Sequence, residues 1–309
     1  MRKRGYRSRA VAATAAAALL GIVGTAGCDA VGGNEAPPGS TSRSKPSPEP
    51  PTWDRTPKSI AAVGDSITRA FDACEVLTDC PAVSWATGTD AKVNSLALRL
   101  LGKTGAAERS WNYAKTGAQM ADVDDQLAQA ATKKPDLVTV LAGANDACQP
   151  TVDAMTSVKD FRAQFVDAMT TLREASPKTQ VFVGSVPDLK RLWSIGRTSE
   201  LSKRMWKLGI CPSMLADPDD LGTAGTSRRD KVQDRVKEYN AVLEDVCEKD
   251  ERCRFDGGAL YKYRFETPQL STWDWFHPST SGQKLLAEMA YRLVTAPKPD
   301  ELKLPTGSG

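Results

Sequence analysis

Short apolar runs alternate with amphipathic helical patterns through most of this 309-residue chain, and this alternation limits the fold more than any other feature. Four runs are short, apolar and bounded by turn residues, which predicts buried strands. They are 59–63, 112–114, 137–141 and 181–186. Helical patterns follow at 117–134, 161–177 and 228–249. A last helix is expected from Ser279 or Thr280, where Thr280-x-x-Gln283 has the spacing of a capping box.

Alternation of this kind predicts a mostly parallel sheet with helices on both faces, and reactive residues at the carboxyl ends of its strands. The flanking segments lack the pattern. Residues 28–58 begin with Cys28 and continue as a Pro-, Gly- and Ser-rich stretch, which predicts an extended tether. Residues 297–309 are Pro- and Lys-rich and are expected to be frayed. We therefore expect one folded domain over residues 59–296.

The charge balance of the chain depends on its first nine residues. The chain has 41 basic and 38 acidic residues, and five of the basic ones lie between positions 2 and 9. Without those five the balance is 36 to 38, so we expect no nucleic-acid partner. An apolar run at 10–23 follows, and it is too short to span a bilayer. Residues 1–27 therefore predict an export signal peptide.

This segment ends in Thr25-Ala26-Gly27-Cys28, which resembles a bacterial lipoprotein signal in which Cys28 becomes the lipidated first residue. Thr25 departs from the pattern, because leucine is usual there. The alternative is ordinary secretion, which would leave Cys28 as a free thiol. We favour lipidation, because exported chains rarely carry an unpaired cysteine. We expect a lipoprotein on the outer face of the bacterial cell membrane, or a secreted protein.

Six cysteines remain when Cys28 is set aside, and outside the cytoplasm an even number indicates disulfides. Proximity in the sequence favours two short-range pairs, and the third pair follows by elimination. The expected disulfides are Cys74–Cys80, Cys247–Cys253 and Cys148–Cys211.

Two short motifs could carry acid–base chemistry. Gly64-Asp65-Ser66 directly follows the first predicted strand, where a serine would have an exposed hydroxyl and a backbone N–H free to bind an anion. Alone, this tripeptide is an ordinary turn. Asp274-x-x-His277 contains the single histidine of the chain, which could activate Ser66 while Asp274 orients the imidazole. The alternative is a surface histidine at the start of a helix.

Two further residues follow successive strands and could stabilise a developing negative charge. Gly117 is expected to begin the helix after the second strand, and Asn145 follows the third. The backbone N–H groups of Ser66 and Gly117 and the amide of Asn145 would form an oxyanion hole. Each residue could also be a simple loop residue. A single histidine excludes zinc sites built on several histidines, and we expect no metal and no cofactor.

Taken in chain order, the four motifs are Gly64-Asp65-Ser66, Gly117, the Asn145 turn and Asp274-x-x-His277. In this order at strand ends they resemble the blocks of the SGNH (GDSL) hydrolases over residues 59–294. The resemblance implies a three-layer α/β/α sandwich with a mainly parallel five-stranded sheet. It also implies a serine esterase with Ser66 as nucleophile and Asp274 and His277 completing a triad. Gly117 and Asn145 match the oxyanion donors, together with the N–H of Ser66. We expect a monomer that acts on a small-molecule or lipid ester.

Further segments resemble the phospholipase-B-like branch of the family and point to lipid esters. They are Ser84-Trp85-Ala86-Thr87-Gly88-Thr89-Asp90, Asn145-Asp146-Ala147-Cys148 and Ile210-Cys211-Pro212. The alternatives are a carbohydrate O-deacetylase and a catalytically silent surface-binding lipoprotein. A disulfide between Cys148 and Cys211 would either fix an insertion over the rim of the site or simply staple two loops.

Overall fold

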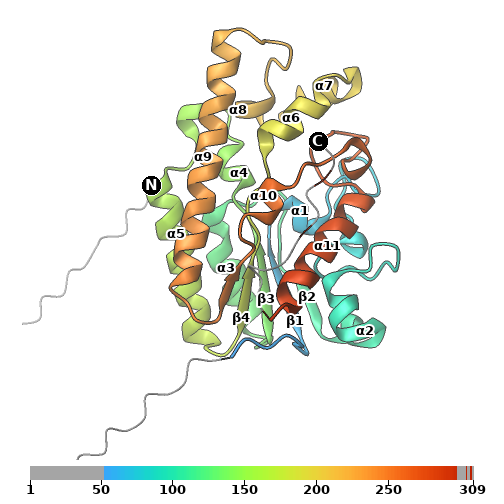
Figure 1. Ribbon diagram of the computed structural model, residues 1–309, viewed down its shortest axis with the longest axis vertical. Coiled ribbons are helices and arrows are strands. Elements are labelled where there is room, and N and C mark those ends of the chain that lie inside the picture. The colour runs from blue at the N-terminus through green and yellow to red at the C-terminus, as the bar shows by residue number, and fades with distance from the viewer. Residues whose placement is uncertain (1–51, 298–303, 305–306, 308–309) are drawn as a thin grey trace, which may run out of the picture. The chain divides into compact units, whose positions relative to one another are not determined.

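The computed structural model of the protein describes residues 52–297, 304 and 307. Five parallel strands form one sheet in the order β2-β1-β3-β4-β5 (Figure 1). The strands are β1 (Ile60–Gly64), β2 (Ser110–Asn112), β3 (Leu137–Leu141), β4 (Gln180–Val183) and β5 (Cys253–Phe255). Every residue of β1 and β3, which lie next to each other inside the sheet, is buried. That burial explains why both strands appear in the sequence as unbroken apolar runs.

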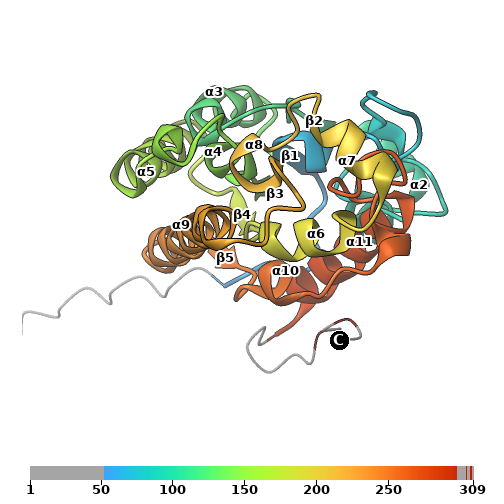
Figure 2. The ribbon, with the colours of Figure 1, turned by 90° about the horizontal axis from the view of Figure 1, so that it is seen from above.

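Helices cover both faces of the sheet (Figure 2), which confirms the predicted three-layer α/β/α fold. The long helices on one face are α3 (Met120–Ala131), α5 (Val158–Ala175) and α9 (Thr223–Glu248), and those on the other are α2 (Leu96–Glu108) and α11 (Thr280–Thr295). The short helices are α1 (Ser66–Arg69), α4 (Ala144–Ala147), α6 (Leu189–Gly196), α7 (Glu200–Trp206), α8 (Pro212–Leu215) and α10 (Ala259–Lys262). Single 3-10 turns lie at Pro81–Val83, Val152–Ala154 and Thr267–Gln269. No helix in the described part of the chain is long and apolar enough to cross a membrane.

Several boundaries differ from the sequence prediction. Strand β2 lies two residues earlier than the predicted 112–114, although the N–H of Tyr113 still donates to Ala62 of β1 at 2.8 Å. Helix α3 begins at Met120, whereas Gly117 lies in the preceding turn. The predicted capping box of α11 is wrong, because Ser279 is the N-cap and Gln283 bonds elsewhere. The buried amide of Gln283 instead accepts from the N–H of Trp85 and donates to the carbonyl of Ile67, both at 2.9 Å.

The packed chain starts before the boundary expected at residue 59. The indole Nε1 of Trp53 donates to the carbonyl of Val294 at 2.9 Å, and the guanidinium of Arg254 lies 4.3 Å from the Trp53 ring. The side-chain amide of Gln180 donates to the carbonyl of Asp54 at 2.9 Å. The predicted signal peptide, Cys28 and most of the predicted tether lie outside the described residues, as do most positions after 297.

Candidate active site

Three neighbouring strands bring the predicted site residues to one edge of the sheet. Strand β1 leads into Ser66, the first residue of α1, and its neighbours β2 and β3 lead toward Gly117 and Asn145. Because the strands are parallel, their carboxyl ends meet at the same edge. Residues spread over 80 positions of sequence are thereby gathered around the start of α1.

The turn that carries Ser66 depends on two residues before it. Gly64 has a φ of +136°, and a Cβ at this position would lie 2.0 Å from the carbonyl oxygen of Leu141 on β3. Only glycine allows the two backbones to approach so closely. Asp65 then caps α1, because its side chain accepts from the N–H of Ile67 at 2.9 Å. The nucleophile candidate therefore sits at the first position of a fixed helical turn.

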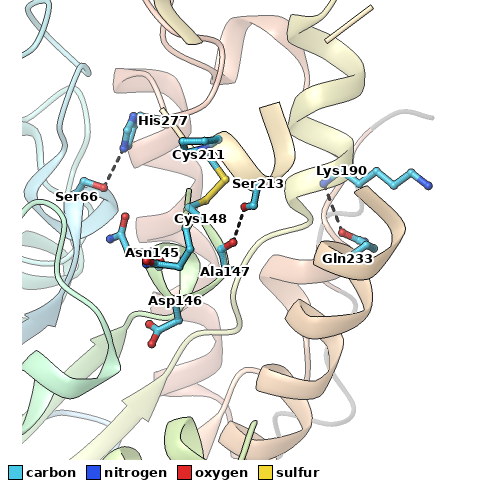
Figure 3. Close-up of a disulfide and its surroundings, with 12 residues drawn as sticks. Ser66, Asn145, Asp146, Ala147, Cys148, Lys190, Cys211, Ser213, Gln233 and His277 are labelled. Carbon is cyan, nitrogen blue, oxygen red and sulfur yellow. Dashed lines mark hydrogen bonds between the residues drawn. A yellow bond between two sulfur atoms is a disulfide. The ribbon is translucent and has the colours of Figure 1, made fainter. Parts of the chain in front are cut away.

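A chain of hydrogen bonds joins Ser66 to the predicted acid–base pair. The Oγ of Ser66 and the Nε2 of His277 are 2.9 Å apart (Figure 3). The Nδ1 of His277 lies 2.5 Å from the Oδ2 of Asp274. Ser66, His277 and Asp274 are 6%, 8% and 0% exposed, so the histidine is not a surface residue. The hydroxyl thus has a base within reach, and the base has a carboxylate behind it.

The loop before α11 holds Asp274 and His277 in this position. The Oδ1 of Asp274 accepts the backbone N–H groups of Phe276 at 2.8 Å and His277 at 2.9 Å. The carbonyl of Asp274 accepts from the indole of Trp206, on α7, at 2.6 Å. The ring of Phe71 meets the imidazole edge-on, with 5.1 Å between ring centroids. The three-residue spacing therefore closes a local turn, and a distant helix secures it.

The charges of His277 and Asp274 shift each other's pKa toward the ionised forms. Burial acts to lower the pKa of His277, but Asp274 and two other nearby carboxyl groups outweigh it, and the pKa is raised above its ordinary value. Burial likewise acts to raise the pKa of Asp274, but the charge and hydrogen bond of His277 lower it overall. The arrangement therefore favours a carboxylate beside an imidazole that gains a proton readily.

Other carboxyl groups lie in or near this site, and sequence reasoning gave them no role. Burial raises the pKa of Asp65 to about 7 and that of Asp146 to about 6. Asp72, Asp274 and His277 form the one group of three possible metal-binding side chains in the described part of the chain. Because the Nδ1 of His277 and the Oδ2 of Asp274 already bond to each other, we assign this group to hydrogen bonding within the site.

Each of the three predicted oxyanion donors has an N–H hydrogen that no described residue accepts. Among the described residues, neither the N–H of Ser66 nor that of Gly117 donates a hydrogen bond. Gly117 has a φ of +83°, a conformation that favours glycine. The Nδ2 of Asn145 donates to the carbonyl of Ala118 at 2.9 Å, which orients the amide and leaves its second hydrogen free of described partners. Such groups can stabilise an anion at the site.

A disulfide lies beside this cluster (Figure 3). Cys148 ends the helix that contains Asn145, and it is joined to Cys211 at the start of α8. The hydroxyl of Ser213 adds a hydrogen bond of 2.6 Å to the carbonyl of Ala147. Segment 189–215, whose three helices were not predicted, is therefore attached directly to the Asn145 turn. The other two disulfides are Cys74–Cys80 and Cys247–Cys253, so all three pairs are those expected from the sequence.

Comparisons with known proteins show which family the chain matches. Residues 60–290 match the family model described as GDSL-like Lipase/Acylhydrolase. No protein in a curated collection matches the chain.

Similar solved structures include the crystal structure of TesA, at 16% identity, covering 75% of this chain and 96% of that one with a TM-score of 0.43. A putative GDSL-like lipase from Parabacteroides merdae has 15% identity, coverage of 79% and 99%, and a TM-score of 0.41. A family 3 carbohydrate esterase from Clostridium thermocellum has 16% identity, coverage of 76% and 93%, and a TM-score of 0.47.

Proposed function

The chain belongs to the GDSL-like lipase/acylhydrolase family, and from this premise we propose that it is a serine esterase that hydrolyses lipid esters through Ser66, His277 and Asp274. The observation that carries the proposal is the hydrogen-bonded chain from the Ser66 hydroxyl through His277 to the Asp274 carboxylate. The unpaired donors at Ser66, Gly117 and Asn145 support it, because an ester carbonyl needs such groups when it becomes an oxyanion. These features also count against a catalytically silent binding protein.

The first half of the reaction forms an acyl-enzyme. The Nε2 of His277 takes the proton of the Ser66 hydroxyl while Oγ attacks the ester carbonyl carbon. The carbonyl oxygen becomes an anion and accepts hydrogen bonds from the N–H groups of Ser66 and Gly117 and the amide of Asn145. When the tetrahedral intermediate collapses, the alcohol leaves with the proton from His277, and the acyl group stays on Ser66.

The second half repeats these steps with water. His277 takes a proton from a water molecule, whose oxygen attacks the acyl carbon on Ser66. Collapse of the second tetrahedral intermediate returns the proton to the Ser66 Oγ and releases the carboxylic acid. Asp274 stays ionised throughout, because it stabilises the imidazolium that forms in each half.

Apolar side chains exposed around the site support lipid esters as substrates. Leu77 is 56% exposed, Trp273 39% and Leu208 66%. Trp273 is next to Asp274, and Leu208 lies two residues after helix α7, whose Trp206 bonds the Asp274 carbonyl. Leu77 lies in the loop closed by Cys74–Cys80, and its N–H donates to the side chain of Asp72. The carbonyl of Asp72 in turn accepts from the hydroxyl of Ser271 at 2.8 Å. Such a rim would favour acyl chains over sugars.

The proposal extends to the place where the protein works. We propose an exported monomer, attached to the outer face of the cell membrane through lipid on Cys28 or else secreted. Three disulfides support export, because disulfides persist in oxidising compartments.

The test of function is a rate series over acetyl, butyryl, octanoyl and palmitoyl esters. It uses the mature chain, which is the protein without the predicted signal peptide 1–27, and Ser66→Ala is the matched control. We expect hydrolysis that rises with acyl length and is lost in Ser66→Ala. Preference for acetyl esters of a polysaccharide would favour the O-deacetylase alternative. No hydrolysis of any ester would favour the silent binding protein.

A further inference from the structure

A second aspartate, Asp72, lies close to Asp274 and His277 of the proposed triad. Asp72 is 1% exposed and follows α1 with a left-handed backbone of φ +57°. Its N–H donates to the carbonyl of Thr78 at 3.0 Å, and one side-chain oxygen accepts from the N–H of Leu77. The disulfide Cys74–Cys80 closes this loop. The loop therefore fixes a carboxyl group in the interior, almost entirely out of contact with solvent.

The other side-chain oxygen of Asp72 has no hydrogen-bond partner in the described part of the chain. A carboxyl oxygen of Asp72, one of Asp274 and a ring nitrogen of His277 all lie within 4.8 Å of one another. The Asp72 backbone is tied to the same loop, since its carbonyl accepts from the hydroxyl of Ser271 at 2.8 Å. Two buried carboxyl groups, those of Asp72 and Asp274, therefore lie close to the imidazole of His277.

Two adjacent buried carboxylates repel each other, so one of them keeps its proton to a higher pH. Burial and then the charge of Asp274 raise the pKa of Asp72 to about 6. The groups that face Asp72 are Asp274 and His277, and those that face His277 are Asp274, Asp72 and Asp65. When Asp72 loses its proton, its negative charge helps to raise the pKa of His277.

We propose that Asp72 is a positioning residue of this site, whose buried carboxyl competes with Asp274 for a proton and sets the acidity at which His277 can accept the Ser66 proton. In acid the proton stays on Asp72, and as the pH rises it leaves to solvent. The charge that remains favours the protonated imidazole. The inference rests on the proposed function for the role of His277 as a base, but the coupling between the two groups can be measured without catalysis.

The experiment compares the full mature chain with Asp72→Asn and with Glu75→Gln as the matched control. Asparagine keeps an oxygen for the Leu77 N–H, tolerates a positive φ and removes the charge. Glu75 is an exposed residue of the same loop, and it is not among the charged groups that act on the pKa of His277. NMR follows the titration of His277 directly, because the chain has no other histidine.

We expect Asp72→Asn to lower the His277 titration midpoint by about half a pH unit or more, and Glu75→Gln to leave it unchanged. The acid limb of kcat/KM should move by the same amount. An unchanged His277 midpoint in Asp72→Asn would overturn the proposal, as would an upward shift. If that variant does not fold, Asp72→Gly removes the same charge and also accepts a positive φ. A shifted midpoint in a chain that hydrolyses no ester would support the coupling and refute the proposed function.

Discussion

Gln283 connects α11 to the turn that carries Ser66, and its replacement by methionine tests that connection. The side chain is fully buried and satisfies two backbone groups, the N–H of Trp85 and the carbonyl of Ile67. Methionine has a similar size but leaves the N–H of Trp85 buried without a partner, while the carbonyl of Ile67 keeps its bond from the N–H of Ala70 at 3.2 Å. An unsatisfied buried donor costs about 1–3 kcal/mol, and the free energy of unfolding should fall by about that amount.

Thermal unfolding of the mature chain measures this loss. For a domain of this size, 1 kcal/mol corresponds to about 2–4 °C in Tm, so even the lower bound predicts a decrease of about 2–4 °C. The matched control is Gln129→Met on α3, because Gln129 is exposed and its amide bonds only the carbonyl of Asp125 one turn earlier. We expect that control to stay within about 0.5 kcal/mol of wild type. If the two methionine variants had equal Tm values, the role assigned to Gln283 would be wrong.

Three further outcomes are expected. Asn145→Ala should lower kcat by a factor on the order of 10²–10³, since it removes one oxyanion donor, and an unchanged kcat in steady-state assays would contradict that role. Trp53→Ala should lower Tm by about 4 °C or more, because the chain loses the bond to Val294 and the contact with Arg254. The kcat on short-chain esters should not change. An unchanged Tm would place the domain boundary back at residue 59. Stability should fall as pH rises from about 4 to about 7, because the raised pKa of Asp65 makes the folded chain bind more protons than the unfolded chain there. Calorimetry at about pH 5.5 and about pH 8 should give the higher Tm at pH 5.5, and the reverse order would refute this reading.

The interior strands could be predicted because their burial on both faces leaves a direct mark in the sequence. Strand β5 leaves no such mark, since it has three residues with Arg254 at its centre and is only half-buried. The helices α6 and α7 are short, and their signals are local caps: Asp188 and Ser199 accept from N–H groups three residues later. Those caps were present in the sequence, but a cap without a long periodic pattern is weak evidence of a helix.

The residues of the candidate site also fall into two groups, those that local sequence motifs could predict and those that they could not. Ser66, Asn145 and His277 could be predicted because each belongs to a short motif at the end or start of an element. Asp72 and Trp206 could not, because their links to the Asp274 loop depend entirely on tertiary contacts. Gln283 was misread for a related reason, since a buried backbone pair elsewhere in the fold competes with the local cap for its amide.

Covalent labelling can show whether Ser66 is the nucleophile. The mature chain would be treated with an organophosphonate ester, which reacts with an activated serine and mimics the tetrahedral intermediate, and the modified peptide would be located by mass spectrometry. We expect one phosphonate per chain on Ser66, with hydrolysis lost in proportion to labelling and no label in His277→Ala. Label on a different residue, or undiminished hydrolysis when Ser66 is fully modified, would contradict it.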